Sequence, residues 1–170
     1  MRWIRAAVIS GLCAGSLLAQ STIFIVRHAD RYGTEPDPSI TEEGQRQAAA
    51  LARLLADAHI TRIFTSEALR TQQTAAPTAR QARIQPTIVD AGNLDELIRL
   101  VRTSLRPGEA TLIVGHRGTV PRIVKALTGE SVSPLAVDEY DRLQVVTLFP
   151  GGQSSVLTLR FGHDHESGTP

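Results

Sequence analysis

The sequence has a single cysteine, Cys13, and a single lysine, Lys125, among its 170 residues. It also lacks an excess of charge, because 18 Lys and Arg residues stand against 17 Asp and Glu residues and the net charge is +1. This balance excludes a general nucleic-acid-binding surface, so any anion-binding site must be local. Almost all of the positive charge is arginine, whose forked guanidinium suits phosphate oxygens. The arginine excess is equally typical of a GC-rich genome.

No apolar run is long enough to cross a bilayer as a helix. A shorter stretch, Ala6 to Ala19, follows Arg2 and Arg5 and ends in small residues, which is the pattern of a secretory signal peptide. We therefore predict a cleaved signal peptide over residues 1–19 and a periplasmic or extracellular protein without stable membrane insertion. Cys13 lies inside this segment, so disulfides and thiol chemistry are excluded for the cleaved chain. A cytosolic N-terminal helix is the alternative.

The remaining chain alternates apolar runs, typical of buried strands, with apolar residues at helical spacing. The runs predict strands over residues 22–26, 61–65, 85–90, 110–114, 143–149 and 156–161. Helices are predicted after Thr41 and Ser66, which can cap them, and over residues 94–101 and 120–127. Pro77 is expected to kink or restart the second helix. This order predicts one domain over residues 20–162, an α/β/α sandwich with a mostly parallel sheet and an antiparallel edge, followed by a loose tail over 163–170.

Two of the predicted strands end in a histidine. Arg27-His28-Ala29-Asp30-Arg31 follows the first strand, and Gly115-His116-Arg117-Gly118 follows the strand over residues 110–114. Arg70 lies one turn into the helix that follows the strand over residues 61–65. The carboxyl ends of parallel strands meet at one edge of a sheet, where open α/β folds bind ligands. A lone histidine at a strand end is usually structural, but here we expect two to converge with two arginines.

Two imidazoles and two guanidinium groups suit phosphoryl transfer. Guanidinium groups bind phosphate oxygens in pairs and neutralise the charge of the phosphoryl group in flight. An imidazole can attack phosphorus to form a phosphohistidine, and neighbouring cations keep that imidazole neutral. A zinc site is the alternative for two histidines, but it needs further ligands and the arginines repel a cation. The terminal cluster His163-Asp164-His165-Glu166 resembles a metal-binding tract by composition only.

Four segments resemble motifs of the histidine phosphatase superfamily, also called phosphoglycerate mutase-like, and they occur in the family's order. They are Arg27-His28-Ala29, Ile40-Thr41-Glu-Glu-Gly44-Gln-Arg-Gln47-Ala48, Ser66-Glu-Ala-Leu-Arg70-Thr-Gln-Gln-Thr-Ala75 and Val114-Gly115-His116. Two longer segments, Arg27-His28-Ala29-Asp30-Arg31 and Gly115-His116-Arg-Gly-Thr119-Val-Pro121, resemble a compact exported branch. Ala29 stands where the family usually has glycine.

This resemblance implies a phosphoglycerate mutase-like fold, with His28 as the phosphorylated nucleophile. It also implies a phosphate pocket formed by Arg27, Arg70 and His116, and no metal or organic cofactor. Arg31 resembles an additional phosphate-binding arginine of some acid phosphatases in the superfamily.

The proton donor to the leaving oxygen is not identified by the resemblance. Larger members of the superfamily carry a glutamate in a Glu-x-x-x-Gly-type insertion, which this sequence lacks. The candidates are Asp30, which is nearest to His28 in sequence, Glu96 and Asp141. For Asp30, the alternative role is an ion pair with Arg31.

We therefore predict an exported phosphohydrolase that removes a phosphoryl group from a small phosphomonoester through a phosphohistidine on His28. A phosphohistidine-protein phosphatase is the first alternative, and phosphoglycerate mutase activity is disfavoured by the short chain. The alternative from another class is a non-catalytic phosphate- or anion-binding envelope protein. The substrate and the oligomeric state are left open by the sequence.

Overall fold

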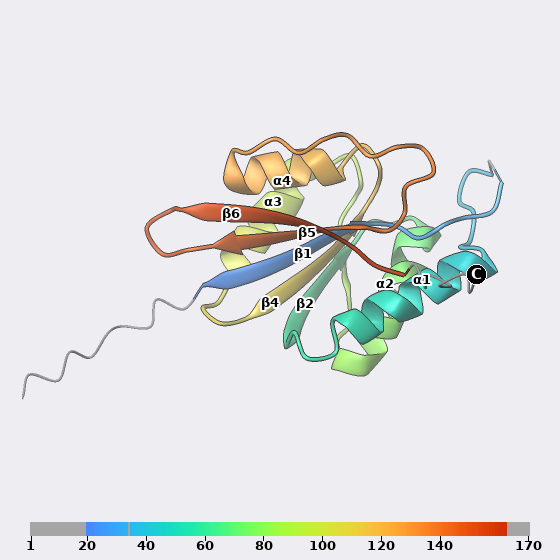
Figure 1. Cartoon of the computed structure of the whole chain (residues 1–170), viewed down its shortest axis with the longest axis horizontal. Helices are drawn as coiled ribbons and strands as arrows, with labels where there is room; N and C mark the ends of the chain where they lie inside the picture. Colours follow the sequence, from blue (N-terminus) through green and yellow to red (C-terminus); the bar gives the residue numbers. More distant parts are fainter. Residues whose placement is uncertain (1–19, 34, 163–170) are drawn as a thin grey trace, which may run out of the picture.

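The computed structural model describes residues 20–33 and 35–162. The predicted signal peptide and the predicted tail, with its His163-Asp164-His165-Glu166 cluster, lie outside the described residues. Within them, strands and helices follow one another in the predicted order (Figure 1). They are β1 (Ser21–Arg27), α1 (Glu42–Leu54), β2 (Ile60–Thr65), α2 (Leu69–Ala82), β3 (Thr87–Ile88), α3 (Leu94–Ser104), β4 (Ala110–Gly115), α4 (Val120–Thr128), β5 (Arg142–Leu148) and β6 (Ser154–Arg160).

The strands form one six-stranded sheet in the order β3-β2-β4-β1-β5-β6. The four strands from β3 to β1 pair in parallel, whereas β5 pairs antiparallel with both β1 and β6. The predicted mostly parallel sheet with one antiparallel edge is therefore confirmed. In the part of the chain that the structure describes, no helix combines the length and the apolar character needed to cross a membrane.

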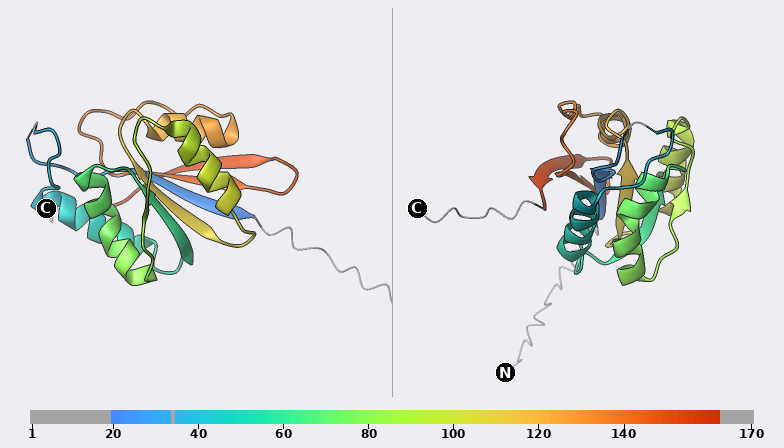
Figure 2. Two further views of the ribbon diagram at one scale, coloured as in Figure 1. Left: turned by 180° about the vertical axis from the view of Figure 1, so that it is seen from behind. Right: turned by 90° about the vertical axis from the view of Figure 1, so that its right-hand side faces the viewer.

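Helices cover both faces of the sheet, which gives three layers (Figures 1 and 2). The side chains of β1 alternate between the two resulting cores, because successive residues of a strand point to opposite faces. Ile23 and Ile25 pack with α3 and α4, while Val26 packs with α1 and α2. Burial on both faces explains why the sequence of β1 is a continuous apolar run rather than an alternating one.

The start of α1 follows the predicted capping chemistry. The Thr41 hydroxyl accepts a hydrogen bond from the backbone N–H of Gly44, and Glu42 and Glu43 occupy the first turn, where carboxylates are favourable. Gly44 is required here by close packing, because a Cβ at this position would overlap the backbone carbonyl of Asp30. The helix start is thereby fitted against the segment that follows β1.

The start of α2 differs from the prediction. Ser66 does not cap this helix, which has Ala68 at its N-cap without a side-chain hydrogen bond. Instead, the Asp37 carboxylate accepts a 2.8 Å hydrogen bond from the backbone N–H of Leu69. The helix also continues through Pro77 from Leu69 to Ala82, so the predicted restart at Pro77 is wrong. Asp37 replaces Ser66 because the turn after β2 extends two residues beyond Ser66 before the helix begins.

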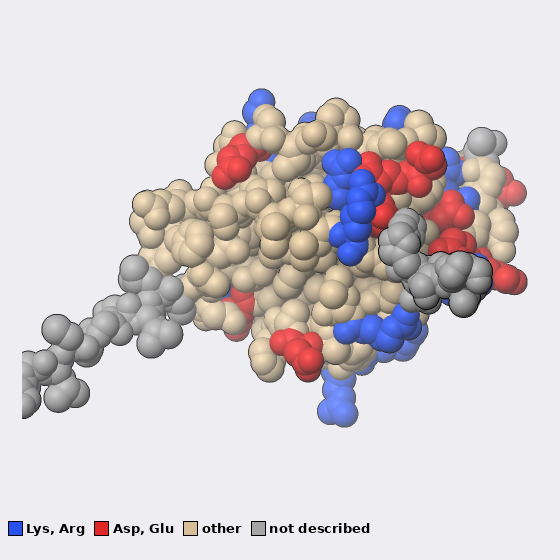
Figure 3. All heavy atoms as spheres, viewed as in Figure 1, with Lys and Arg blue, Asp and Glu red and all other residues tan. Residues whose placement is uncertain are grey.

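Charged side chains are unevenly distributed over the surface (Figure 3). The surface over the β5–β6 hairpin is largely uncharged, and Leu157 and Leu159 of β6 are exposed there. Acidic and basic side chains gather toward the end of the sheet where the parallel strands finish. That end of the sheet is where the predicted site residues lie.

Candidate active site

The two central strands bring the two predicted histidines together. Arg27 ends β1 and is in register with Gly115, which ends the neighbouring parallel strand β4. The backbone N–H of His28 continues the pairing by donating a 2.9 Å hydrogen bond to the carbonyl of Gly115. The imidazole rings of His28 and His116 therefore lie edge to face, with their centroids 5.5 Å apart. The expected convergence of the two strand ends is thus present in the structure.

His28 is buried and its ring orientation is fixed. Its Nδ1 lies 2.9 Å from the carbonyl oxygen of Ala29, so Nδ1 carries the proton and Nε2 is left with its lone pair. Burial, together with the positive charges of Arg27 and Arg70 and the nearby His116, lowers the pKa of His28 from 6.5 to about 3. The hydrogen bond to Ala29 opposes this shift. His28 is therefore a neutral base over most of the pH range.

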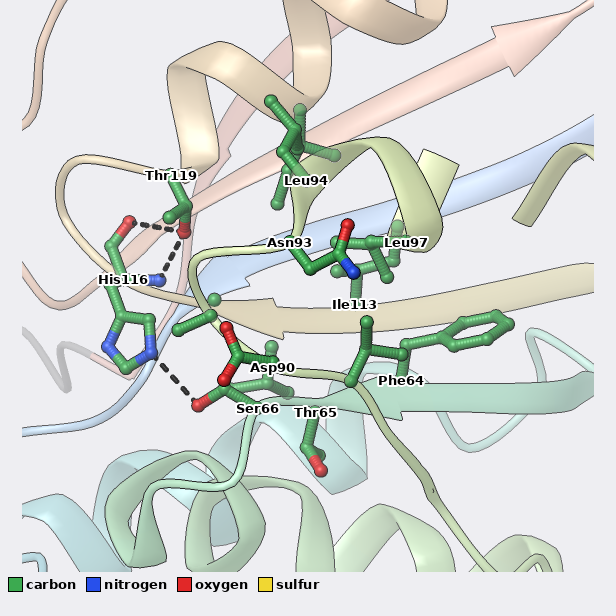
Figure 4. A pocket seen from close by; sticks show the side chains of 15 residues that line it. Phe64, Thr65, Ser66, Asp90, Asn93, Leu94, Leu97, Ile113, His116 and Thr119 are labelled. Carbon is green, nitrogen blue, oxygen red and sulfur yellow. Dashed lines mark hydrogen bonds between the residues drawn. The ribbon is translucent and has the colours of Figure 1, made fainter. Parts of the chain in front are cut away.

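His116 is held by Ser66 and Thr119 (Figure 4). Its Nε2 lies 2.9 Å from the Ser66 hydroxyl, and its backbone N–H donates a 2.8 Å hydrogen bond to the Thr119 hydroxyl. Burial lowers the pKa of His116, as do Arg70 and Arg27, whereas the negative charge of Glu67 raises it. His116 is thus a second neutral imidazole. It is orientated by the hydroxyl groups of Ser66, which follows β2, and Thr119, which precedes α4.

Arg27 is clamped by the loop that precedes β5. Its Nη1 donates to the backbone carbonyls of Ala136, Val137 and Glu139, at 3.2, 2.8 and 3.0 Å. Its guanidinium carbon lies 3.8 Å from the centre of the Tyr140 ring, a cation–π contact. Its Nε is buried and has no hydrogen-bond partner among the described residues. The clamp fixes the guanidinium group while leaving this donor available.

Arg70 approaches from the first turn of α2. Its Nη1 lies 3.5 Å from the carboxylate of Asp37, the same group that binds the start of the helix. Its Nε, like that of Arg27, is buried without a partner in the part of the chain that the structure describes. Its charge acts on both His28 and His116. Buried donors without partners are rare in proteins and mark a place where an acceptor can bind.

Asp30 and Arg31 have structural contacts near this cluster. The Asp30 carboxylate accepts a 2.8 Å hydrogen bond from the Thr41 hydroxyl, so it is tied to the start of α1. The Arg31 guanidinium donates to the backbone carbonyls of Tyr32 and Gly33. Both side chains are near enough for their charges to affect the pKa of Arg27, which burial lowers. The Asp30 carboxylate is thus bound by Thr41, and its role as proton donor stays a prediction.

The other two predicted proton donors are engaged away from the histidines. Glu96 lies on the exposed side of α3 and pairs with Arg99 at 2.6 Å. Asp141 is buried and pairs with Arg160 of β6 at 2.7 Å. Among residues 20–33 and 35–162, no three His, Cys, Asp or Glu side chains are close enough to hold a metal ion.

Several contributors were not singled out as site residues in the sequence. Ser66 was recognised only as a helix cap, and Glu67 received no role. Tyr140 lies 5.9 Å from the His28 ring, centroid to centroid, as well as against Arg27. Thr74 in α2 accepts a 2.9 Å hydrogen bond from the backbone N–H of Ala29. The only available signal for Ser66, Glu67 and Thr74 was that they belong to the same motif as Arg70. The sequence gives no such signal for the ring of Tyr140, although the neighbouring Asp141 is a candidate proton donor.

Comparison with known proteins agrees with this geometry. The family model of the histidine phosphatase superfamily (branch 1) matches residues 23–98, which include Arg27, His28 and Arg70. No curated protein sequence matches the chain.

Solved structures show the same fold. A mycobacterial glucosyl-3-phosphoglycerate phosphatase superposes with a TM-score of 0.67 at 13% identity, over 83% of this chain and 99% of its own. The alpha-ribazole phosphatase from Shigella flexneri gives 0.66 at 14% identity, over 82% of this chain and 96% of its own. The protein histidine phosphatase SixA complexed with tungstate gives 0.63 at 19% identity, over 82% and 96%. The chain is thus similar to the histidine phosphatase superfamily in its match to the family model over residues 23–98, and it shares the fold of solved phosphatases.

Proposed function

We propose that the protein is a phosphohydrolase that cleaves phosphomonoesters through a phosphohistidine on His28. The observation that carries the proposal is the pairing of a neutral, orientated imidazole with two buried arginine Nε groups that have no partner among the described residues. A tetrahedral phosphate dianion is the ligand that such donors suit, because guanidinium groups bind its oxygens directionally. The similarity of the fold to several phosphatases supports the same reaction class.

The reaction has two steps. The lone pair on His28 Nε2 attacks phosphorus, the bond from phosphorus to the leaving oxygen breaks, and that oxygen receives a proton to give an alcohol. A water molecule then attacks the phosphohistidine, the P–N bond breaks, and inorganic phosphate is released. In both steps, Arg27, Arg70 and His116 stabilise the charge on the transferring group.

Trapping the intermediate tests this proposal. The protein is mixed with p-nitrophenyl phosphate, quenched in base, where phosphohistidine survives, and digested for mass spectrometry. We expect a phosphoryl group on His28 and a burst of p-nitrophenol, and we expect neither for His28→Ala. Wild-type protein that binds phosphate but gives no burst and no turnover would support the non-catalytic anion-binding alternative instead.

A second candidate is a phosphatase that acts on phosphohistidine in proteins. It is favoured by the fold shared with SixA, which is described as a protein histidine phosphatase. Turnover of a phosphohistidine peptide faster than of small phosphomonoesters would select this candidate. His28→Ala removes both activities, so it serves as the control for each.

Export of the protein is proposed from the N-terminal pattern alone. Arg2 and Arg5 followed by the apolar stretch up to Ala19 are its support. N-terminal sequencing of the protein from the culture fluid or periplasm tests it. A start at Gln20 is expected, and a start at Met1 in the cytosolic fraction contradicts it.

A further inference from the structure

The reaction needs a proton for the leaving oxygen, and the predicted donors are engaged elsewhere. Asp30 is bonded to Thr41, Glu96 pairs with Arg99, and Asp141 pairs with Arg160. We propose that Glu67 is the proton donor of this site. This inference rests on the proposed function, because it assigns a further group to the same reaction.

The position of Glu67 is fixed from two sides. It follows Ser66, whose hydroxyl contacts His116 Nε2 at 2.9 Å. Its own Oε2 accepts a 2.8 Å hydrogen bond from the backbone N–H of Ala91, in the loop after β3. This contact ties the carboxyl group to a residue that lines the same cleft as His116. The residue is exposed, so a bound substrate can reach its other oxygen.

Glu67 belongs to the His116 side of the site, because the adjacent Ser66 contacts His116 and Ala91, which binds Glu67, lines the same cleft as His116. The negative charge of Glu67 also raises the pKa of His116. His116 lies across the site from His28, with 5.5 Å between ring centroids. In an in-line displacement the leaving oxygen departs opposite the attacking nitrogen. In this proposal Glu67 is beside the path of the leaving group, while Arg27 and Arg70 bind the oxygens of the phosphoryl group.

With Glu67 as proton donor and acceptor, the protons balance in both steps of the reaction. In the first step, the protonated Glu67 gives its proton to the leaving oxygen as the P–O bond breaks, which yields an alcohol and a carboxylate. In the second, the carboxylate takes a proton from the water that attacks phosphorus, and the P–N electron pair returns to His28 Nε2. Free phosphate leaves and Glu67 is again protonated, so no further reactant is required.

Asp90 is the competing carboxylate. It lines the same cleft beside His116 as Ser66 and Asn93 do (Figure 4). Its Oδ1, however, accepts a 2.7 Å hydrogen bond from the backbone N–H of Gly92, which gives it a role in shaping the turn after β3. The structure therefore favours Glu67, and a variant of Asp90 belongs in the test.

The test compares leaving groups of different acidity. Phenyl phosphate needs a proton at its leaving oxygen, whereas 2,4-dinitrophenyl phosphate releases a stable anion. Glu67→Gln keeps an oxygen that can accept from Ala91 and lacks only the acidic proton. We expect its kcat/KM for phenyl phosphate, which reports only the steps up to phosphohistidine formation, to fall by about 100-fold, the usual contribution of general acid catalysis, and its kcat/KM for dinitrophenyl phosphate to fall far less. The rate of the variant will thus depend more steeply on leaving-group pKa than that of wild type.

Matched variants make each outcome decisive. Glu130→Gln makes the same change at an exposed site beyond α4, and is expected to behave as wild type. The proposal is overturned if Glu67→Gln loses kcat/KM equally on both substrates, if it loses none, or if Asp90→Asn gives the leaving-group-dependent loss. Different measurements test the proposed function itself. It is overturned if the wild-type protein forms no phosphohistidine, or if His28→Ala keeps the activity.

Discussion

The guanidinium carbon of Arg27 lies 3.8 Å from the centre of the Tyr140 ring, while three backbone carbonyls bind its Nη1. The arginine that we propose to bind phosphate is thereby held in place by a loop more than 100 residues away along the chain. The same tyrosine also borders His28. Residues 136–140 are consequently part of the site, although none of them carries a charge that a phosphate could bind directly.

This contact predicts that the ring of Tyr140 matters and its hydroxyl does not. A partly desolvated cation–π contact contributes about 0.5–2 kcal/mol, which corresponds to a roughly 3- to 30-fold change in kcat/KM. We expect a loss in this range for Tyr140→Ala and a change of less than about twofold for Tyr140→Phe, which keeps the ring. Equal losses in the two variants would show that the hydroxyl group acts.

Removal of Arg70 should weaken both phosphate binding and turnover. Loss of one positioned donor to a transition-state oxygen typically costs about 100- to 1,000-fold in kcat. We expect Arg70→Ala to fall in this range with p-nitrophenyl phosphate, and inorganic phosphate to inhibit it less. Arg70→Lys should recover only part of the activity, because an ammonium group lacks the paired donors. Full recovery with lysine would mean that charge alone is sufficient.

The hydrogen bond from Ser66 to His116 should affect catalysis more than folding. Ser66→Ala removes the hydrogen bond to His116, of about 1 kcal/mol, so we expect a roughly 5- to 10-fold lower kcat. The same hydroxyl also contacts Thr71 and the backbone N–H of Ala68, and these two contacts are lost with it. Thermal unfolding should change by only a few degrees. The matched control is Ser133→Ala, since Ser133 is exposed in the loop before β5. An unchanged kcat for Ser66→Ala would show that Thr119 alone orientates His116.

The buried histidines predict that acid destabilises the protein. The pKa of His28 is lowered from 6.5 to about 3 by burial and nearby cations, so between these values the unfolded chain binds a proton that the folded chain does not. The free energy of unfolding must then fall as the pH decreases through this window, by at most about 1.4 kcal/mol per pH unit from this group. Urea unfolding at pH 7, 6, 5 and 4 measures this slope. His28→Gln should make it shallower, and an unchanged slope contradicts the assignment.

Glu139 predicts a link between stability and activity. Its buried carboxylate binds Arg142 at 2.7 Å and Arg160 at 2.9 Å, and its backbone carbonyl binds Arg27. Breaking a buried ion pair by removing one partner costs about 3–5 kcal/mol. We expect Glu139→Ala to lower the free energy of unfolding by about 3 kcal/mol and to reduce kcat/KM in the protein that remains folded. Normal kcat/KM would show that Arg27 keeps its place without this anchor.

Local patterns in the sequence were sufficient to predict the order of the strands and helices, the mostly parallel sheet and the helix cap at Thr41. They were also sufficient to expect Arg27, His28, Arg70 and His116 near one another, because strand ends in a parallel sheet share an edge. These features depend on periodicity and on residues within a few positions of each other.

Contacts made by loops could not be predicted in this way. Asp37 bonds to the start of α2 from 32 positions earlier, which leaves Ser66 free to contact His116. Tyr140 reaches Arg27 because Arg160 of β6 holds the neighbouring Glu139 and Asp141. Each of these contacts depends on where the folded sheet places two distant segments. The local sequence of either segment does not indicate which residue it will contact.

The parallel pairing of β1 with β4 determines how the protein loses its activity on heating. The distance between the two histidines is set by the backbone hydrogen bonds of the innermost strands, down to the contact between His28 and Gly115. Such strands exchange their amide hydrogens only when the whole domain opens. Heat inactivation and global melting should therefore coincide, with no inactive but still folded species between them.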